Sequence, residues 1–245
     1  MESSKITQIK IAFLSALPPF RGGISSFSHF LVKALNGKSL VEAFTFKKQY
    51  PNFLFPGESQ FSENQEASFP RIVTSYNPLT YLTAVRKLKG SKPDVFVVNY
   101  WMPFFAPMYA FLARRLSNSV FKVALIHNLT PHEERFFDRF LNKVFLKNFD
   151  AFVVLSEKVN KDLLSYRPDA ISKVIPHPTY AQFGTRKDFK HAREYFRIEK
   201  DAKVLLFFGL IRDYKGLDIL IDAMNFLDER YVLLIAGEIY GDKKK

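Results

Sequence analysis

Three observations predict an α/β protein with a doubly wound, mostly parallel sheet. Short apolar runs alternate along the chain with segments whose apolar residues recur at helical spacing. The runs are apolar throughout, as expected of strands that are buried on both faces. The chain has 245 residues, 47% of them hydrophobic and 24% charged, which is enough for two modest domains with cores of their own.

The first strand is expected at Ile9–Leu17 and the helix after it carries a face of Phe27, Phe30 and Leu31. The loop between them ends in Gly22 and Gly23. Since glycine has no Cβ, this pair lets the backbone approach a ligand closely. A tight turn between strand and helix explains the pair equally well.

The middle of the chain repeats the alternation. A long apolar run at Val95–Ala113 is divided by Asn99 and two prolines, which favours a strand, a loop and a helix over a membrane span. The next helix is expected at His132–Phe149, with a buried stripe of Phe136, Phe137, Phe140, Leu141, Val144 and Phe145. Further strands are expected at Val41–Phe46, Val95–Val98, Phe121–Ile126 and Ala151–Leu155, a helix from Asn77 to Lys89, and a helix cap at Ser156.

Two prolines around His177 interrupt this rhythm and predict a connector. We place the domain boundary after it, with residues 1–183 as the first domain and residues 184–245 as the start of a second. A helix at Lys187–Phe196 and strands at Val204–Phe208 and Tyr231–Ala236 do not complete a sheet. The second domain is therefore expected to be incomplete, and the chain to be part of a longer protein.

A loop in this second segment has the composition of a phosphate site. Gly209, Arg212, Lys215 and Gly216 lie between the strand at Val204–Phe208 and a helix. Backbone N–H groups at a helix N-terminus bind phosphate. An arginine and a lysine in the same loop suit a diphosphate. An ordinary surface arginine is the alternative for Arg212.

Composition and net charge limit the classes of partner that the chain is expected to bind. The chain has no cysteine, which excludes disulfides and thiolate metal sites. A formal net charge of +12 favours anionic partners, although a merely soluble surface has the same composition. The pair Arg114–Arg115, near Trp101, Phe104 and Phe105 in sequence, suggests an anionic membrane surface. No nucleic-acid motif accompanies the charge, so nucleic acid is not expected as a partner.

Several motifs together resemble the retaining GT-B glycosyltransferases of family 4, which include phosphatidylinositol mannosyltransferases. The matching pieces are PPFRGGISSF at Pro18–Phe27, ALIHNLTPHE at Ala124–Glu133, FVVLSE at Phe152–Glu157, VIPHPTYAQF at Val174–Phe183, FFGLIRDYKGLDILIDAM at Phe207–Met224 and AGE at Ala236–Glu238. The resemblance implies two Rossmann-like domains, the first on the acceptor side and the second holding a nucleotide-sugar donor. A pair of glutamates seven residues apart, which the family carries later in its second domain, lies beyond the end of this sequence.

The resemblance also implies roles for individual residues. Arg212 and Lys215 would neutralise the leaving diphosphate, and His127 would hydrogen-bond the transferred sugar. No metal and no cofactor is implied, since the nucleotide sugar is a substrate. The donor-binding set would be Gly22, Gly23, Gly209, Arg212, Lys215 and Glu238, and the acceptor side would comprise Arg21, Trp101, Asn128 and His132.

The sequence therefore predicts a glycosyltransferase, or a fragment of one, that moves a sugar from a nucleotide-diphosphate donor to a glycan or a lipid-linked acceptor with retention. A cytoplasmic protein, peripheral on the membrane, is expected because no apolar leader follows the first charged residues. Two alternatives remain open, a GT-B nucleotide-sugar epimerase and a non-catalytic module that binds acceptor or membrane.

Overall fold

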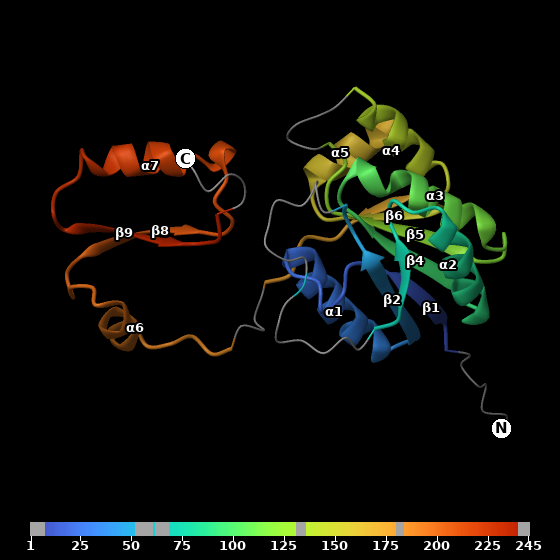
Figure 1. Ribbon diagram of the computed structural model, residues 1–245, viewed down its shortest axis with the longest axis horizontal. Coiled ribbons are helices and arrows are strands. Elements are labelled where there is room, and N and C mark those ends of the chain that lie inside the picture. The colour runs from blue at the N-terminus through green and yellow to red at the C-terminus, as the bar shows by residue number, and fades with distance from the viewer. Residues whose placement is uncertain (1–7, 52–60, 62–68, 131–135, 180–183, 240–245) are drawn as a thin grey trace. The chain divides into compact units, whose positions relative to one another are not determined.

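The computed structural model describes residues 8–51, 61, 69–130, 136–179 and 184–239 (Figure 1). The described chain divides into two compact units between His177 and Pro178. The expected boundary, between residues 183 and 184, lies a few residues further along. Within the described ranges, no helix combines the length and the apolar character that crossing a membrane requires.

A seven-stranded sheet forms the centre of the first unit (Figure 1). Every pair of neighbouring strands in it is parallel, which confirms the predicted α/β class. The strand order is β3-β2-β1-β4-β5-β6-β7. The strands are β1 (Lys10–Leu14), β2 (Leu40–Lys48), β3 (Arg71–Thr74), β4 (Val95–Tyr100), β5 (Phe121–Ile126), β6 (Ala151–Val154) and β7 (Ser172–Val174).

The strand order reverses between β1 and β4. From β1 the chain adds β2 and β3 on one side, then returns to place β4 on the other side of β1. In open parallel sheets, the crevice at the carboxyl ends of the strands beside such a reversal is where ligands bind. The loops that follow β1, β4 and β5 are therefore where a ligand is expected.

Helices cover the two faces of the sheet unequally. Helix α1 (Gly23–Asn36) covers one face, where Phe13 of β1 packs with Val32. The opposite face packs against four helices, and Leu14 of β1 belongs to that larger core. The alternation of Phe13 and Leu14 between the faces follows from the two-residue repeat of a strand. The four helices are α2 (Leu79–Gly90), α3 (Ala106–Arg115), α4 (Asp138–Leu146) and α5 (Glu157–Tyr166); a short 3-10 turn, η2 (Pro103–Phe105), precedes α3.

Helix α4 buries a different face from the one predicted. Phe145 is fully buried, as expected, but Phe136 is 95% exposed and Phe140 is 67% exposed. Two polar side chains, Asp138 and Asn142, lie in the core instead, at 5% and 0% exposure. Asn142 is satisfied there because its amide donates to the carbonyl of Leu129 and its Oδ1 accepts from the hydroxyl of Tyr100. These two hydrogen bonds offset the cost of burying the amide.

The second unit holds two parallel strands, β8 (Lys203–Phe208) and β9 (Tyr231–Ala236). Their side chains are poorly covered by the described residues, since Leu206 is 59% exposed and Phe208 is 80% exposed. Parallel strands are normally buried on both faces. The other elements of the unit are α6 (Phe189–Phe196), η4 (Asp213–Lys215) and α7 (Leu217–Met224).

Candidate functional site

The loop after β1 leads into an open helix N-terminus. Gly22 precedes the first residue of α1 with φ +105°, a conformation that residues with a side chain rarely adopt. A Cβ built on Gly22 or Gly23 would meet no heavy atom within 4 Å. The first N–H groups of a helix have no partner within it, and the first turn of α1 has no acidic residue. The N–H groups of this turn are thus available to an anion.

A buried hydrogen-bond network connects this turn to the sheet. The hydroxyl of Ser28 on α1 donates to the carbonyl of Ile24 at 2.6 Å. Its oxygen lies 2.7 Å from the hydroxyl of Ser15, which follows β1, and 2.7 Å from Nδ2 of Asn99 in β4. Because Ser28 has a single proton, Ser15 and Asn99 are the donors to it. The first turn of α1 is therefore held to both strands at the reversal point.

His127 follows β5 at the same edge of the sheet. Its backbone N–H donates to the carbonyl of Tyr100 at 2.8 Å. Its ring lies edge-on to Phe27 of α1, with ring centres 4.9 Å apart, and 5.4 Å from the ring of His177. Burial, and secondarily the nearby His177, lowers the pKa of His127 to about 3. The imidazole is consequently neutral at physiological pH.

The imidazole also has an unused polar atom. Nε2 of His127 is buried and has no hydrogen-bond partner among the described residues, and the same is true of Oδ1 of Asn99. Most buried polar atoms in proteins are hydrogen-bonded. A substrate hydroxyl that reached His127 would satisfy its ring nitrogen without an ion pair.

The residues predicted on the acceptor side differ in their burial and contacts. Arg21 is exposed beside Gly22, and Asn128 is partly buried directly after His127. Trp101 is partly buried, where its indole N–H donates to the hydroxyl of Tyr50 at 3.0 Å. Its ring packs on Phe105 with centres 4.6 Å apart, so it contributes to the core as well as to this edge. His132 lies outside the described residues.

The loop after β8 gathers the predicted cations of the second unit. Gly209 has φ +115°, and a Cβ built there would lie 3.3 Å from Nζ of Lys215. The backbone N–H of Lys215 donates to the carbonyl of Arg212 at 3.0 Å, which closes the loop into a tight turn. Gly216 then begins α7 in the left-handed conformation, with φ +67°. The structure therefore brings Gly209, Arg212 and Lys215 together in one loop.

The end of β9 contacts this loop closely. The N–H of Ile211 donates to the carbonyl of Glu238 at 2.9 Å. A Cβ built on Gly237 would lie 1.9 Å from the carbonyl oxygen of Gly209. Only glycine fits at position 237, which explains the small residue before Glu238. Glu238 thus lies beside the loop that carries Arg212 and Lys215.

The network of Ser15, Ser28 and Asn99 is absent from the sequence prediction. Asn99 interrupts a strongly apolar strand, and Ser25 and Ser28 fall on the buried face of α1. Polar residues at positions where the sequence pattern predicts burial are the signal that could have identified this network. Within the described chain, no group of three His, Cys, Asp or Glu residues could hold a metal ion.

The fold is shared with several sugar-nucleotide proteins of known structure. The Anabaena protein HepE in complex with UDP and glucose aligns with a TM-score of 0.60 and 15% identity, over 94% of this chain and 61% of that chain. An α-glucosyltransferase with UDP and DNA gives 0.54 and 12%, over 95% and 68%. The UDP-GlcNAc 2-epimerase of Methanocaldococcus jannaschii gives 0.54 and 13%, over 93% and 65%. The chain thus spans less than two thirds of the HepE and epimerase chains.

No curated protein matches the chain. A family model, however, matches residues 54–181, slightly more than half of the sequence, and its description is Glycosyltransferase Family 4. The matched segment runs through β3 to β7 and includes His127 at the carboxyl edge of the sheet. Taken with the parallel sheet, this match shows that the chain belongs to glycosyltransferase family 4.

Proposed function

We propose that the chain is the acceptor-side domain and part of the donor domain of a glycosyltransferase that uses a nucleotide-diphosphate sugar. The observation that carries the proposal is the edge of the first unit at the reversal point. There, the open N-terminus of α1 and the neutral, unsatisfied His127 lie on adjoining loops. The family and the UDP-bound structural neighbours support a nucleotide-sugar donor.

The proposed chemistry follows from where charge develops. When the bond between C1 of the sugar and the diphosphate oxygen breaks, negative charge accumulates on the diphosphate. Arg212, Lys215 and the N–H groups that follow Gly22 would stabilise that charge, because preorganised cations and N–H donors act where the charge forms. His127 would donate or accept one hydrogen bond with a sugar hydroxyl.

We infer retention at C1 from the sequence resemblance. The acceptor oxygen would attack from the face that the diphosphate leaves, and the departing diphosphate would take the acceptor proton. We propose a glycan or a lipid-linked acceptor, as in phosphatidylinositol mannosyltransferases, and an incomplete second domain.

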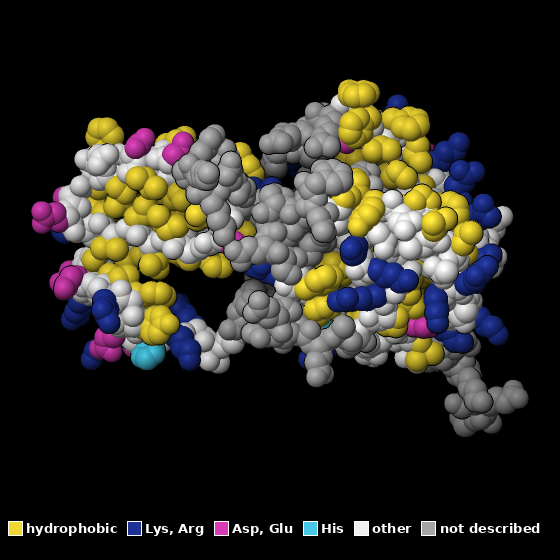
Figure 2. Space-filling model, viewed as in Figure 1, with side chains coloured by type: hydrophobic (Ala, Val, Ile, Leu, Met, Phe, Trp, Pro, Cys, Tyr) yellow, Lys and Arg dark blue, Asp and Glu magenta, His cyan; other side chains and the backbone are white. Residues whose placement is uncertain are grey.

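The surface of α4 supports a peripheral position on an anionic membrane. Phe136 and Phe137, which precede α4, and Phe140 in its first turn are exposed, whereas Phe105, expected at a membrane surface, is buried. Hydrophobic side chains gather over α4 in Figure 2, with lysines and arginines beside them. The cations of this helix are Arg139 and Lys143. We propose no nucleic-acid partner, since the sequence has no motif for one.

An epimerase is the second candidate, because two UDP-GlcNAc 2-epimerases have the same fold. Their likeness shows the fold alone, whereas the family match concerns glycosyltransferases. The products separate the two functions. A transferase releases a nucleoside diphosphate and needs an acceptor, while an epimerase returns a nucleotide sugar.

The proposal is tested with UDP-sugars and the longest natural form of the protein. Arg212→Ala and Lys215→Ala should each lower the transfer rate about a hundredfold, since each removes a contact worth about 3 kcal/mol in the transition state. Lys33→Ala, an exposed cation in the last turn of α1, is the control. Transfer rates within threefold of the parent for both loop variants would show that Arg212 and Lys215 do not stabilise the leaving diphosphate.

A further inference from the structure

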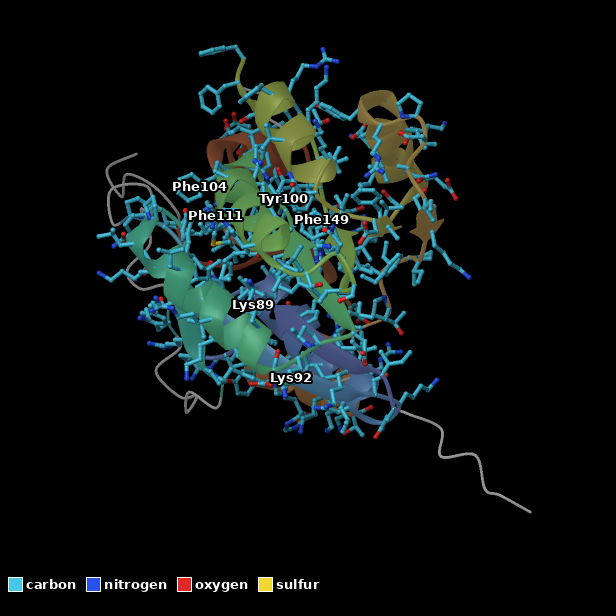
Figure 3. The ribbon with its side chains drawn as sticks, turned by 90° about the vertical axis from the view of Figure 1, so that its right-hand side faces the viewer. Lys89, Lys92, Tyr100, Phe104, Phe111 and Phe149 are labelled. Carbon is cyan, nitrogen blue, oxygen red and sulfur yellow. The ribbon has the colours of Figure 1, made fainter. Side chains whose placement is uncertain are left out.

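A cavity of about 450 Å³ lies far from the carboxyl edge of the sheet. Its walls come from the end of α2, the end of α3 and the loop before β5, all of which precede the amino ends of β4 and β5. In Figure 3, Lys89 and Lys92 lie below Tyr100 and Phe104, with Lys92 the farthest from them. The cavity is thus separate from the loops of the proposed transfer site.

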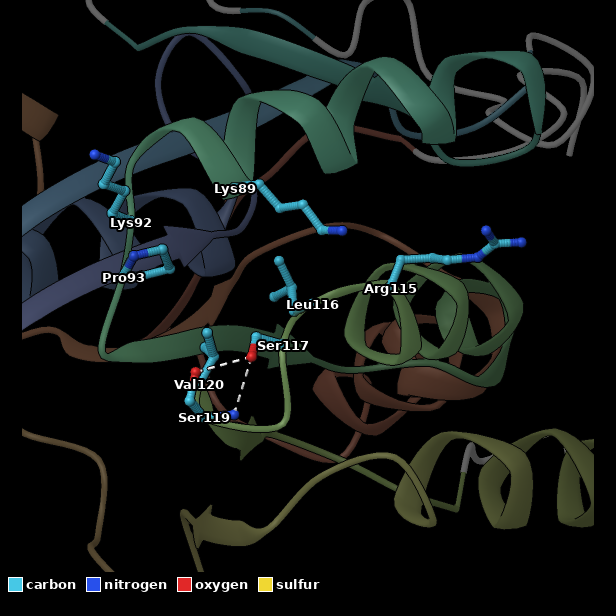
Figure 4. A pocket seen from close by; sticks show the side chains of 8 residues that line it. All are labelled: Lys89, Lys92, Pro93, Arg115, Leu116, Ser117, Ser119 and Val120. Atoms are coloured by element: carbon cyan, nitrogen blue, oxygen red, sulfur yellow. Dashed lines mark hydrogen bonds between the residues drawn. The ribbon is translucent and has the colours of Figure 1, made fainter.

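Three cationic residues line this cavity. Lys89 lies in the last turn of α2, Lys92 follows that helix, and Arg115 ends α3. No acidic residue lines the cavity, and within the described part of the chain none of the three cations forms an ion pair. In Figure 4 the side chains of Lys89 and Arg115 extend in the same direction, and that of Lys92 extends the opposite way.

The ordinary role of such residues is to complement the carbonyls at the end of a helix. Two helices end here, and each contributes about half a negative charge. Three full positive charges exceed that by about two. The carboxylates of Asp94 and Asp150 at this edge accept the backbone N–H groups of Lys10 at 2.8 Å and Lys122 at 2.7 Å, and neither lines the cavity. The residues that line the cavity therefore carry positive charge without an acidic side chain among them.

The remaining wall supplies hydrogen-bond donors. The hydroxyls of Ser117 and Ser119 lie 2.8 Å apart and share one hydrogen bond, drawn in Figure 4. Two hydroxyls have two protons, so one proton is left for a ligand. Beneath the loop, the ammonium of Lys122 donates to the carbonyls of Ser117 and Val120 and adds a buried positive charge. Cations and hydroxyls together match the oxygens of a phosphate group.

We infer that this cavity is a second binding site of the protein, specific for a multiply charged phosphate group. A volume of about 450 Å³ accommodates more than one phosphate, such as a diphosphate or a phosphate with its organic substituent. A neighbouring cavity of about 590 Å³ shares Arg115 and has apolar walls that include Phe111 and Val144. The phosphate could therefore belong to a free compound or to a lipid headgroup, and the test has an arm for each.

The test measures pyrophosphate binding by calorimetry on the 245-residue chain. All proteins carry Arg212→Gln and Lys215→Gln, which remove the cations of the β8 loop as a competing diphosphate site. Adding Lys89→Gln and Arg115→Gln should weaken binding about tenfold or more. The control adds Lys33→Gln and Lys161→Gln, which remove the same charge from exposed positions of α1 and α5. The control should stay within about twofold of the reference.

Lys89 and Arg115 are exposed, so the variants should keep the parent's thermal unfolding, which is measured alongside. In the second arm, phosphatidylcholine vesicles with phosphatidic acid are sedimented with the same proteins. If substituting Lys89 and Arg115 weakens both pyrophosphate binding and vesicle sedimentation, the site binds a lipid headgroup. If it weakens pyrophosphate binding alone, the site binds free phosphates. Equal losses in the cavity and control variants, or no pyrophosphate binding by the reference protein, would overturn the inference.

Discussion

His127 combines the proposed sugar-binding position with a cost to stability. The unfolded chain binds a proton at this side chain near pH 6.5, whereas burial lowers the folded pKa to about 3. Between these values the unfolded state holds more protons, so the free energy of unfolding falls as the pH falls. The neutrality that suits a sugar hydroxyl thus makes the first unit sensitive to acid.

Lowering the pH from 7 to about 5 should therefore reduce the free energy of unfolding by about 2 kcal/mol through His127. Urea unfolding at both pH values measures this. His127→Gln, which does not titrate, should remove most of the difference, while His191→Gln on the exposed surface of α6 should not. An unchanged pH dependence in His127→Gln would show that the ring is solvated in the native state.

Ser28 contributes to the stability of the first unit through its buried hydrogen bonds with Ser15 and Asn99. Ser28→Ala would leave Nδ2 of Asn99 and the hydroxyl of Ser15 without their acceptor in a buried place. A loss of about 1–3 kcal/mol is expected for each buried group left unsatisfied. Ser26→Ala, on the same helix but only partly buried, should change the stability by less than about 0.5 kcal/mol. Denaturant unfolding of the two variants provides the comparison.

At the scale of elements, α4 shows how a helix with many aromatics chooses its buried face. Phe136 and Phe137 precede this helix and Phe140 lies in its first turn, and periodicity alone assigns all three to the core. The structure instead buries Phe145 and Asn142, because Tyr100 stacks on Phe145 with ring centres 3.8 Å apart and also donates to Asn142. The exposed aromatics are left on a basic helix.

Phe145→Ala should cost about 3–5 kcal/mol of stability, since it leaves a cavity in the core. Phe140→Ser should cost less than about 0.5 kcal/mol, since its side chain is 67% exposed. The same Phe140→Ser change should weaken sedimentation with anionic vesicles at low salt. Phe226→Ser, at 89% exposure in the second unit, is the matched control. Equal stability losses at positions 140 and 145 would contradict the observed face.

At the scale of the molecule, the two units differ in how well they are covered. The first has seven strands between layers of helices. The second has two described strands, with Leu206, Phe208 and Ile235 at 43–80% exposure. Local stability follows the density of buried apolar contacts. The two units should accordingly differ in how readily their backbones open.

Hydrogen exchange of the 245-residue chain should show this difference. Amides of β8 and β9 should exchange much faster than those of β1, β4 and β5. A longer form of the protein that supplies further strands should slow exchange in β8 and β9 and leave β1 unchanged. Equal protection of both sheets in the 245-residue chain would show that the second unit is stable by itself.

The sequence alone determined the alternation of strands and helices, and this is enough for the α/β class. Apolar runs such as Phe121–Ile126 and Tyr231–Ala236 match β5 and β9 residue for residue, because a short continuous apolar run rich in branched side chains favours a strand. Ser156 caps α5 as expected, accepting from the N–H of Val159. The glycines at positions 22, 209 and 216 were identifiable as loop residues, and each adopts a positive φ.

Tertiary structure alone decided which polar groups lie together. The short edge strands β3 and β7 escaped prediction because three or four residues of ordinary composition give no periodic signal. Asn99 meets Ser28 across 71 positions of sequence, and His127 meets Phe27 and His177 only because β5 and α1 adjoin at one edge. Local sequence sets strand and helix, whereas burial and hydrogen-bond satisfaction are properties of the assembled sheet. For that reason the neutral state of His127 and the exposed face of α4 required the structure.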